Sequence, residues 1–173
     1  DIIAGFPGES DEDFAASIDL AREIGFSHIH AFTFSPREET PAARMEDRVD
    51  GRVAAERSRA LRELSGELKL SYYRSLVGTE EDVLLEEAEA EVPHAALRSL
   101  AARGKPETPI RTEAVQEKAL GATESRIGGR GYGRRYVPVV IPRAGLEVNQ
   151  VYRVRLSGVV EGDGGPVLVG RLT

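Results

Sequence analysis

The sequence predicts an α/β domain followed by a small β domain. Residues 1–34 show a strand, a helix and a second strand in succession, which is typical of α/β folds. From residue 79 onward, short β-prone runs are separated by Gly, Pro, Asn or Asp, which favours a small barrel or sandwich. Residues 121–173 carry eight basic and four acidic side chains, although the whole chain has a net charge of −6. This charge asymmetry predicts either an anionic partner for the β domain or a solvated basic face.

Composition sets limits on the protein class. The chain has 173 residues, of which 40% are hydrophobic and 30% charged, as in ordinary soluble globular proteins. The chain has no run of 18 apolar residues, so we expect no membrane span, and its composition is compatible with the cytoplasmic location that we expect. The absence of cysteine excludes disulfides, thiolate metal sites and any iron–sulfur cluster ligated by this chain. Because the chain opens inside a strand without Met, we expect a piece of a longer protein.

The first strand, residues 1–4, leads into a turn containing two glycines, Gly5-Phe6-Pro7-Gly8. Glycine permits positive φ and lets a ligand approach the backbone closely. Ser10 is placed to cap the next helix, and the acidic residues 11–13 favour its positive end but disfavour a phosphate site. The turn therefore allows two interpretations, a plain strand-to-helix turn or a small-molecule site.

A helix is predicted over residues 11–24, where Phe14, Ile18, Ala21 and Ile24 form an apolar stripe and Gly25 ends it. Residues 26–34 then predict a strand parallel to the first. Ligands of such a unit lie beside the carboxyl ends of the strands, near residues 5–8 and 34–36. His28 and His30 share one strand face, where we favour a structural role over ligand contact.

Residues 35–50 predict a long loop at this ligand edge, and such loops are usually functional. Residues 51–76 regain helical spacing before Gly78, and we expect this helix to link domains at residues 1–78 and 79–173. Strands are predicted over 82–85, 136–142, 150–160 and 167–172, with Pro138 indicating an edge strand. Arg153 and Arg155 are predicted to face outward. Between the strands, residues from about 92 to 121 predict an acidic helical insertion, most simply a solvated excursion.

Residues 126–136, RIGGRGYGRRY, combine arginines, tyrosines and glycines. Guanidinium groups pair with phosphates and aromatic rings stack on bases, so this segment predicts RNA binding. A flexible solvated loop is the alternative. The RNA-binding candidates here are Arg126, Arg130, Tyr132, Arg134, Arg135 and Tyr136.

Several of these segments together resemble one family. They are DIIAGFPGESDEDF at residues 1–14, FTFSPREETPAARMEDRVD at residues 32–50, the helix after it and the late β domain. The chain resembles the radical S-adenosylmethionine (SAM) methylthiotransferases, which join a partial radical-SAM (β/α) barrel to a small RNA-binding β-barrel, the TRAM domain. TPAARMEDRVD is most similar to the branch that modifies N6-threonylcarbamoyladenosine in tRNA.

The resemblance implies a SAM pocket at the first turn and the second strand end. Its residues would be Ile3, Gly5, Phe6, Pro7, Gly8, Glu9, Phe34 and Ser35. Arg37, in a Ser-Pro-Arg motif, would lie near cofactor or substrate, whereas Glu39 replaces a glycine common in the family. Residues 131–136 match the TRAM pattern in Tyr132 and Tyr136, with additional arginines.

The implied function is the C-terminal portion of an enzyme that adds a 2-methylthio group to N6-threonylcarbamoyladenosine beside the anticodon. The implied partners are the tRNA anticodon stem-loop and the missing N-terminal half of the protein, and no membrane is involved. The full-length parent would use SAM and two [4Fe–4S] clusters, whose cysteine ligands this chain lacks, so the chain alone should be inactive. Alternatives are a methylthiotransferase acting on a ribosomal-protein aspartate, a stand-alone RNA-binding module and an unrelated nucleotide-binding α/β domain.

Overall fold

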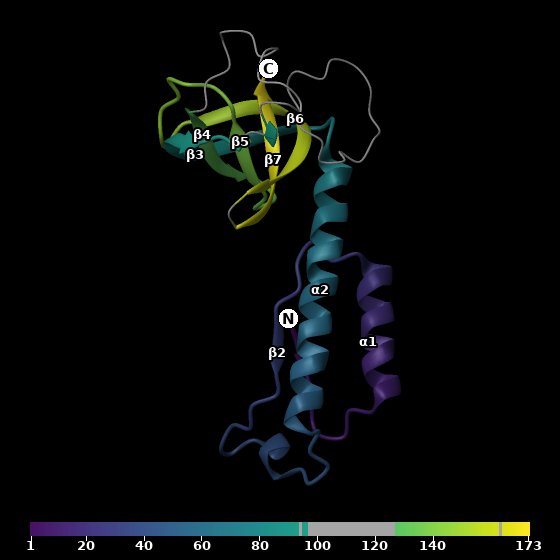
Figure 1. Ribbon diagram of the computed structural model, residues 1–173. Helices are drawn as coiled ribbons and strands as arrows, with labels where there is room; N and C mark the ends of the chain where they lie inside the picture. Colours follow the sequence, from purple (N-terminus) through teal and green to yellow (C-terminus); the bar gives the residue numbers. More distant parts are fainter. Residues whose placement is uncertain (94, 97–126, 163) are drawn as a thin grey trace. The chain divides into compact units, whose positions relative to one another are not determined.

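The computed structural model describes residues 1–93, 95–96, 127–162 and 164–173. They form two compact units, Asp1–Tyr72 and Tyr73–Thr173. The division between the units falls inside the long helix α2 (Gly51–Leu76). Figure 1 shows the elements of both units with their labels.

The first unit begins with β1 (Ile2–Ala4), α1 (Asp11–Ile24) and β2 (Ala31–Thr33). The two strands pair in parallel, which confirms the predicted strand–helix–strand unit. A 3-10 helix, η1 (Pro41–Arg44), lies in the loop before α2. The predicted second strand, residues 26–34, was too long, because β1 offers a partner of only three residues and the pairing register ends at Thr33.

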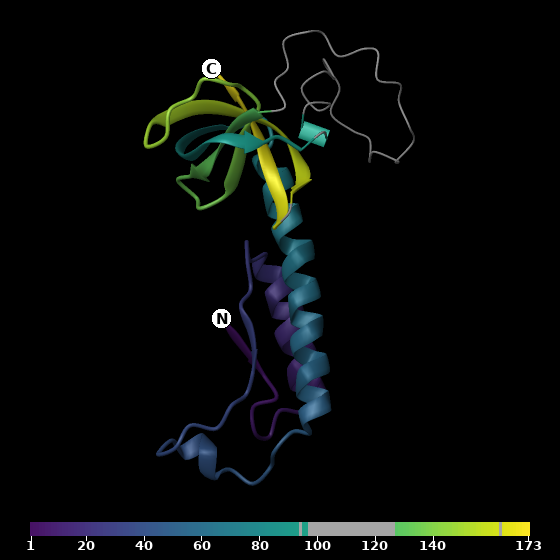
Figure 2. The same cartoon turned by 60° about the vertical axis from the view of Figure 1, so that its left-hand side comes forward.

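Both long helices have the bounds that their end signals predict. Ser10 caps α1 through a capping box with Asp13, and Gly25 ends it in the left-handed conformation at φ 69°. The helices lie on one side of the strand pair (Figure 2). A small core holds this unit together, made by Ile2, Ile18, Ala21, Ile29, Leu64 and Leu68. The predicted stripe of α1 is therefore only partly buried: Ile18 and Ala21 belong to this core, whereas Ile24 is exposed.

The second unit is a closed five-stranded barrel in the order β3-β4-β5-β7-β6, which confirms the predicted β-rich domain. Its strands are β3 (Glu80–Glu91), β4 (Ile127–Gly133), β5 (Pro138–Ile141), β6 (Val151–Gly162) and β7 (Gly165–Leu172). All pairs are antiparallel except β5 with β7. The expectation of an edge strand at Pro138 was wrong, because closure gives β5 two partners and Pro138 is only its first residue.

The glycine-rich segment before Arg134 forms β4, although its composition also suggested a flexible loop. Its glycines bring β4 unusually close to β3. A Cβ on Gly131 would collide with the carbonyl oxygen of Leu84, and one on Gly129 would collide with the Leu85 side chain. Only glycine therefore fits at these two positions between β4 and β3.

The barrel has a dense apolar interior and a smaller outer cluster. Fully buried side chains include Val83, Leu85, Val139, Ile141, Val154, Leu156 and Leu168. The outer cluster contains Val92, Ala96, Val140, Val160 and Val169, so β5 is buried on both faces. The insertion predicted at about 92–121 lies almost entirely outside the described residues. Within the described part of the chain, no helix has both the length and the apolar character needed to cross a membrane.

Replacement of Gly131 by alanine should destabilise the barrel by about 1–3 kcal/mol, because the added methyl group has no space between β4 and β3. Gly164→Ala is the matched control, since a Cβ there meets no heavy atom within 4 Å. Urea unfolding followed by circular dichroism measures both variants. Equal unfolding midpoints for the two variants would contradict this account of the glycines.

Candidate functional site

The turn after β1 is fixed by its own hydrogen bonds. Gly5 and Gly8 have φ values of 76° and 86°, which only glycine adopts readily. The amide of Gly5 donates to Oε2 of Glu9 at 2.7 Å, and the amide of Gly8 donates to the carbonyl of Asp47 at 2.7 Å. A Cβ on Gly5 would lie 2.5 Å from that of Ala54 on α2, whereas one on Gly8 would meet open space. Helix packing thus explains the glycine at position 5.

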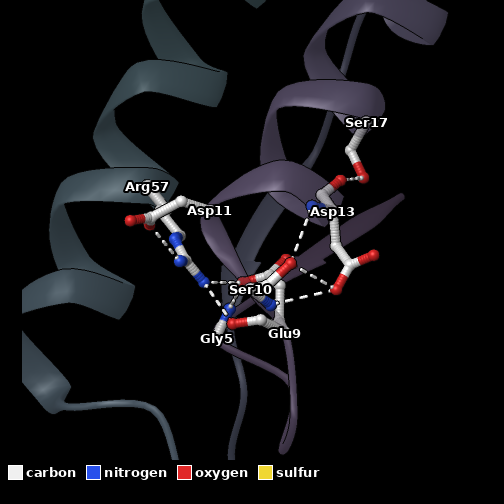
Figure 3. Close-up of polar contacts among 7 residues, drawn as sticks. All are labelled: Gly5, Glu9, Ser10, Asp11, Asp13, Ser17 and Arg57. Carbon is white, nitrogen blue, oxygen red and sulfur yellow. Dashed lines mark hydrogen bonds and ion pairs between the residues drawn. The ribbon is translucent and has the colours of Figure 1, made fainter.

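Arg57 on α2 connects this turn to the start of α1 (Figure 3). Its Nη1 lies 2.6 Å from Oε2 of Glu9 and 3.0 Å from the Glu9 carbonyl, while its Nη2 lies 2.6 Å from Oδ1 of Asp11. The side chains of Arg57 and Glu9 are only 8% and 12% exposed. The hydrogen bond to Asp11 is the main cause that raises the pKa of Arg57, so the guanidinium remains charged.

Sequence reasoning did not identify Arg57 as a site residue, because 46 or more residues separate it from its partners. Glu9, which was expected to contact SAM, directs its carboxylate to Gly5 and Arg57. The Glu9 side chain thus stabilises the turn through contacts inside the protein. Glu9 therefore holds the backbone of the turn in place.

Apolar side chains surround the turn and remain open to a ligand. Ile3, Phe6 and Phe32 are each about half exposed, and the Phe6 and Phe34 rings pack edge to face at 5.3 Å. Ser35 is exposed at the following strand end. Exposed aliphatic and aromatic side chains can pack against a purine ring, so the residues present are compatible with the adenosine part of SAM.

The two histidines of this unit have partners of their own. Their rings pack edge to face at 4.5 Å, although both residues precede β2 and do not lie on the strand face that was predicted for them. Nδ1 of His28 lies 3.3 Å from the Ser65 hydroxyl, and Nδ1 of His30 lies 3.1 Å from Asp1. Burial, followed by His30, lowers the pKa of His28. Among the described residues, no group of three or more His, Cys, Asp or Glu side chains is arranged to hold a metal ion.

The predicted RNA-binding residues divide between the two units. Arg37 belongs to the first unit, and Arg126 lies outside the described residues. The other five lie on β4 and the turn after it, namely Arg130, Tyr132, Arg134, Arg135 and Tyr136, and Arg130 pairs with Glu87 at 3.8 Å. Tyr136 is almost fully exposed and adopts a left-handed conformation with φ 56°.

A recess of about 510 Å³ lies beside these tyrosines. Its lining includes Tyr132, Tyr136, Leu84, Val151, Asp82 and Arg134. A second recess, of about 280 Å³, is lined by Glu80, Glu81, Asp82, Arg134, Arg135 and Arg153. Asp82 and Arg134 line both recesses, so an apolar and a charged surface adjoin each other.

The arginines of this face are paired with carboxylates of β3. Arg153 forms two hydrogen bonds with Asp82, at 2.8 and 3.1 Å, and Arg134 forms an ion pair with the same carboxylate at 2.8 Å. Arg153, followed by Arg134, lowers the pKa of Asp82 below its usual value. Sequence reasoning missed these pairs because they depend on the β3–β6 register, in which Asp82 lies opposite Arg153.

Glu81 on β3 stabilises the turn that follows β4. It is buried, and its Oε1 accepts the Arg134 amide at 2.9 Å. Its Oε2 lies 3.4 Å from Nη1 of Arg135 and has no hydrogen-bond partner in the described structure. A Cβ on Gly133 would lie 2.7 Å from Cγ of Glu81, so the glycine makes space for the carboxylate.

Comparison with known proteins identifies relatives of this chain, although no family model matches it. A tRNA-2-methylthio-N(6)-dimethylallyladenosine synthase from Zymomonas mobilis is 41% identical over 86 residues, which are 50% of this chain and 19% of that protein. A threonylcarbamoyladenosine tRNA methylthiotransferase from Thermotoga maritima is 43% identical over 86 residues, 50% of this chain and 20% of that protein. A synthase from Sorangium cellulosum with the same name as the first is 44% identical over 94 residues, 54% of this chain and 19% of that protein. The matched segment thus spans about a fifth of the length of these curated relatives, and the family resemblance predicted from the sequence is confirmed.

Replacement of Arg57 by methionine should destabilise the first unit by about 3–5 kcal/mol, because it leaves the buried Glu9 carboxylate without its cation. Arg22→Met is the control, since the Arg22–Glu67 pair is more than half exposed and should contribute at most about 1 kcal/mol. Urea unfolding gives both values. A cost for Arg57→Met no larger than that of the control would refute the role assigned to this pair.

Acid should weaken the barrel through Asp82. Its pKa is lowered in the folded state, so its stabilising contribution is complete above the unfolded-state pKa of about 4 and is lost as pH falls through the folded-state value. Asp82→Asn should therefore make the unfolding midpoint less sensitive to pH below about 4. Urea unfolding at several pH values from neutral to acid measures this, and identical pH profiles would contradict it.

Proposed function

We propose that this chain, a relative of the radical SAM methylthiotransferases, is the C-terminal portion of an enzyme that adds a 2-methylthio group to an adenosine of tRNA. One observation carries the proposal: proteins 41–44% identical over half of the chain are named for methylthio modification of tRNA adenosines. Because the matched segment spans only about a fifth of those relatives, the activity of the whole protein is inferred from them.

The first unit would contribute part of the SAM-binding wall of a partial radical-SAM barrel. When bound, SAM supplies the radical and the methyl group in this family. Ile3, Phe6 and Phe34 would contact the adenine ring, and the backbone of residues 7–8 together with Ser35 would border it. Glu9 and Arg57 would hold the turn in shape without entering the reaction.

Iron–sulfur clusters do not fit the residues of this chain. The sequence contains no cysteine, and thiolates are the usual ligands of such clusters. Cluster ligands would therefore come from residues outside this chain, and we assign no step of the reaction to a cluster here.

The second unit would be a TRAM-type domain that grips the tRNA anticodon stem-loop in the cytoplasm. Tyr132 and Tyr136 present ring faces on which unpaired bases stack, and Arg134 lies beside them. The fold suits this role because the recess faces solvent and contains both apolar and cationic surface.

Among the tRNA adenosines that such enzymes modify, we propose N6-threonylcarbamoyladenosine as the substrate. The support is the loop TPAARMEDRVD, residues 40–50, which is most similar to that branch of the family. In the structure this loop contains η1, capped by Thr40, whose hydroxyl accepts the amide of Ala43 at 3.3 Å.

Purified, cluster-loaded full-length parent should convert N6-threonylcarbamoyladenosine in tRNA to its 2-methylthio form, measured by mass spectrometry of digested nucleosides. Parallel assays with tRNA bearing dimethylallyladenosine and with ribosomal protein separate the proposed substrate from its rivals. Modification of dimethylallyladenosine instead would overturn the substrate assignment alone. Absence of a methylthio product on any tRNA adenosine would overturn the proposed function.

A further inference from the structure

We propose that Asp82 assembles Arg134 and Arg153 into a clamp for one RNA phosphate, beside a tyrosine-lined recess that receives the adjoining base. This inference rests on the proposed RNA-binding function of the barrel and adds a defined subsite to it. Two of its residues, Asp82 and Arg153, were not among the binding residues expected from the sequence.

Two cations converge on one carboxylate, that of Asp82. Oδ2 of Asp82 lies 3.1 Å from Nη2 of Arg153 and 2.8 Å from Nη2 of Arg134, while Oδ1 accepts from Nε of Arg153 at 2.8 Å. Two guanidinium groups held this close would repel each other without the anion between them. Asp82 therefore determines the spacing of the pair, which together with Asp82 retains one net positive charge.

The two arginines are much more exposed to solvent than the carboxylate that holds them. The Asp82 side chain is only 14% exposed, whereas those of Arg134 and Arg153 are 78% and 61% exposed. A guanidinium group has five N–H donors, and Asp82 engages two nitrogens of Arg153 and one of Arg134. Their remaining donors face solvent, so a phosphate can join the pair without displacing the carboxylate. Neighbouring fixed guanidinium groups are the preferred protein ligands of phosphate.

The tyrosine-lined recess adjoins this pair of arginines. Its lining includes the apolar side chains of Leu84 and Val151, the exposed rings of Tyr132 and Tyr136 and the carboxylate of Glu86, and it shares Asp82 and Arg134 with the charged recess. In a single RNA strand a phosphate and an unstacked base lie next to each other, which matches this arrangement. An acidic peptide would use only the charged part, so RNA explains more of the surface.

The clamp makes a prediction opposite to that of simple charge. If only net charge mattered, removal of an acidic side chain would strengthen RNA binding. If Asp82 positions the arginines, Asp82→Asn should weaken binding of a fluorescein-labelled unpaired RNA octamer about fivefold or more in anisotropy titrations at fixed salt, a loss within the range expected for one charge-assisted contact. Glu80→Gln is the matched control. Glu80 lines the same recess and pairs with Arg155 at 3.4 Å, so its loss should leave binding unchanged or slightly stronger.

A second variant keeps the charge but removes the geometry. Arg153→Lys should weaken RNA binding although the site remains cationic, because lysine lacks the planar fork that Asp82 and a phosphate engage together. Tyr136→Ala should cost about fivefold or more through lost base stacking. Urea unfolding midpoints for every variant, and titration with polyglutamate as a competing anion, accompany these measurements.

The outcomes separate the two levels of inference. Absence of RNA binding by the unmodified chain would overturn the RNA-binding role together with the clamp. RNA binding that is unchanged or tighter in Asp82→Asn, or unchanged in Arg153→Lys, would overturn the clamp alone. Polyglutamate that displaces RNA at equal charge concentration would also overturn it, since the tyrosine recess would then add nothing.

Discussion

The turn after β1 depends on a single buried carboxylate, that of Glu9. It accepts the Gly5 amide and the Arg57 guanidinium, and Arg57 extends the contact to Asp11 at the start of α1. The strand end, the first helix and α2 are thereby fixed to one another at the edge where parallel strands place their ligands. Since Glu9 and Arg57 are both largely excluded from water, their ion pair is costly to break. The apolar surface of Ile3 and Phe6 is consequently presented on a rigid backbone.

The barrel uses carboxylates in a related way but places the arginines outward. Glu81 is buried and holds the backbone of the turn after β4, and Asp82, which is less exposed than its arginine partners, holds two arginine side chains. The acidic groups lie beneath and the cationic groups face solvent. A surface of this construction offers donors in fixed positions, so less conformational entropy is lost when an anion binds.

The helices were predictable from the sequence because their end signals are local. Ser10 and Gly25 fix the ends of α1 by bonds within a few residues, and the bounds of α2 follow from its spacing and the glycines at 51 and 78. β4 was not predictable as a strand, since its glycines suit a loop and are explained only by the close approach of neighbouring strands, for example Leu84 to Gly131 and Leu85 to Gly129. The edge placement of Pro138 failed for a similar reason, because barrel closure is a property of the whole sheet. Both errors arise because the pairing of strands across the barrel cannot be read from any single segment of the sequence.

The candidate sites also contain some residues that the local sequence identifies and others that only the tertiary structure identifies. Tyr132, Tyr136 and Arg134 were recognisable from residue type alone, whereas Arg57, Asp82 and Arg153 act through partners distant in the sequence. Folding also brings the basic C-terminal third of the sequence against acidic residues from the middle of the chain. Residues 121–173 carry a net charge of +4, yet Arg134, Arg135, Arg153 and Arg155 face Glu80, Glu81 and Asp82 from the acidic middle of the chain. Four cations against three anions leave a weak local field, which salt screens within about 8 Å. Under the proposed RNA-binding role, this face would therefore rely on the geometry of stacking and paired guanidinium groups more than on long-range attraction.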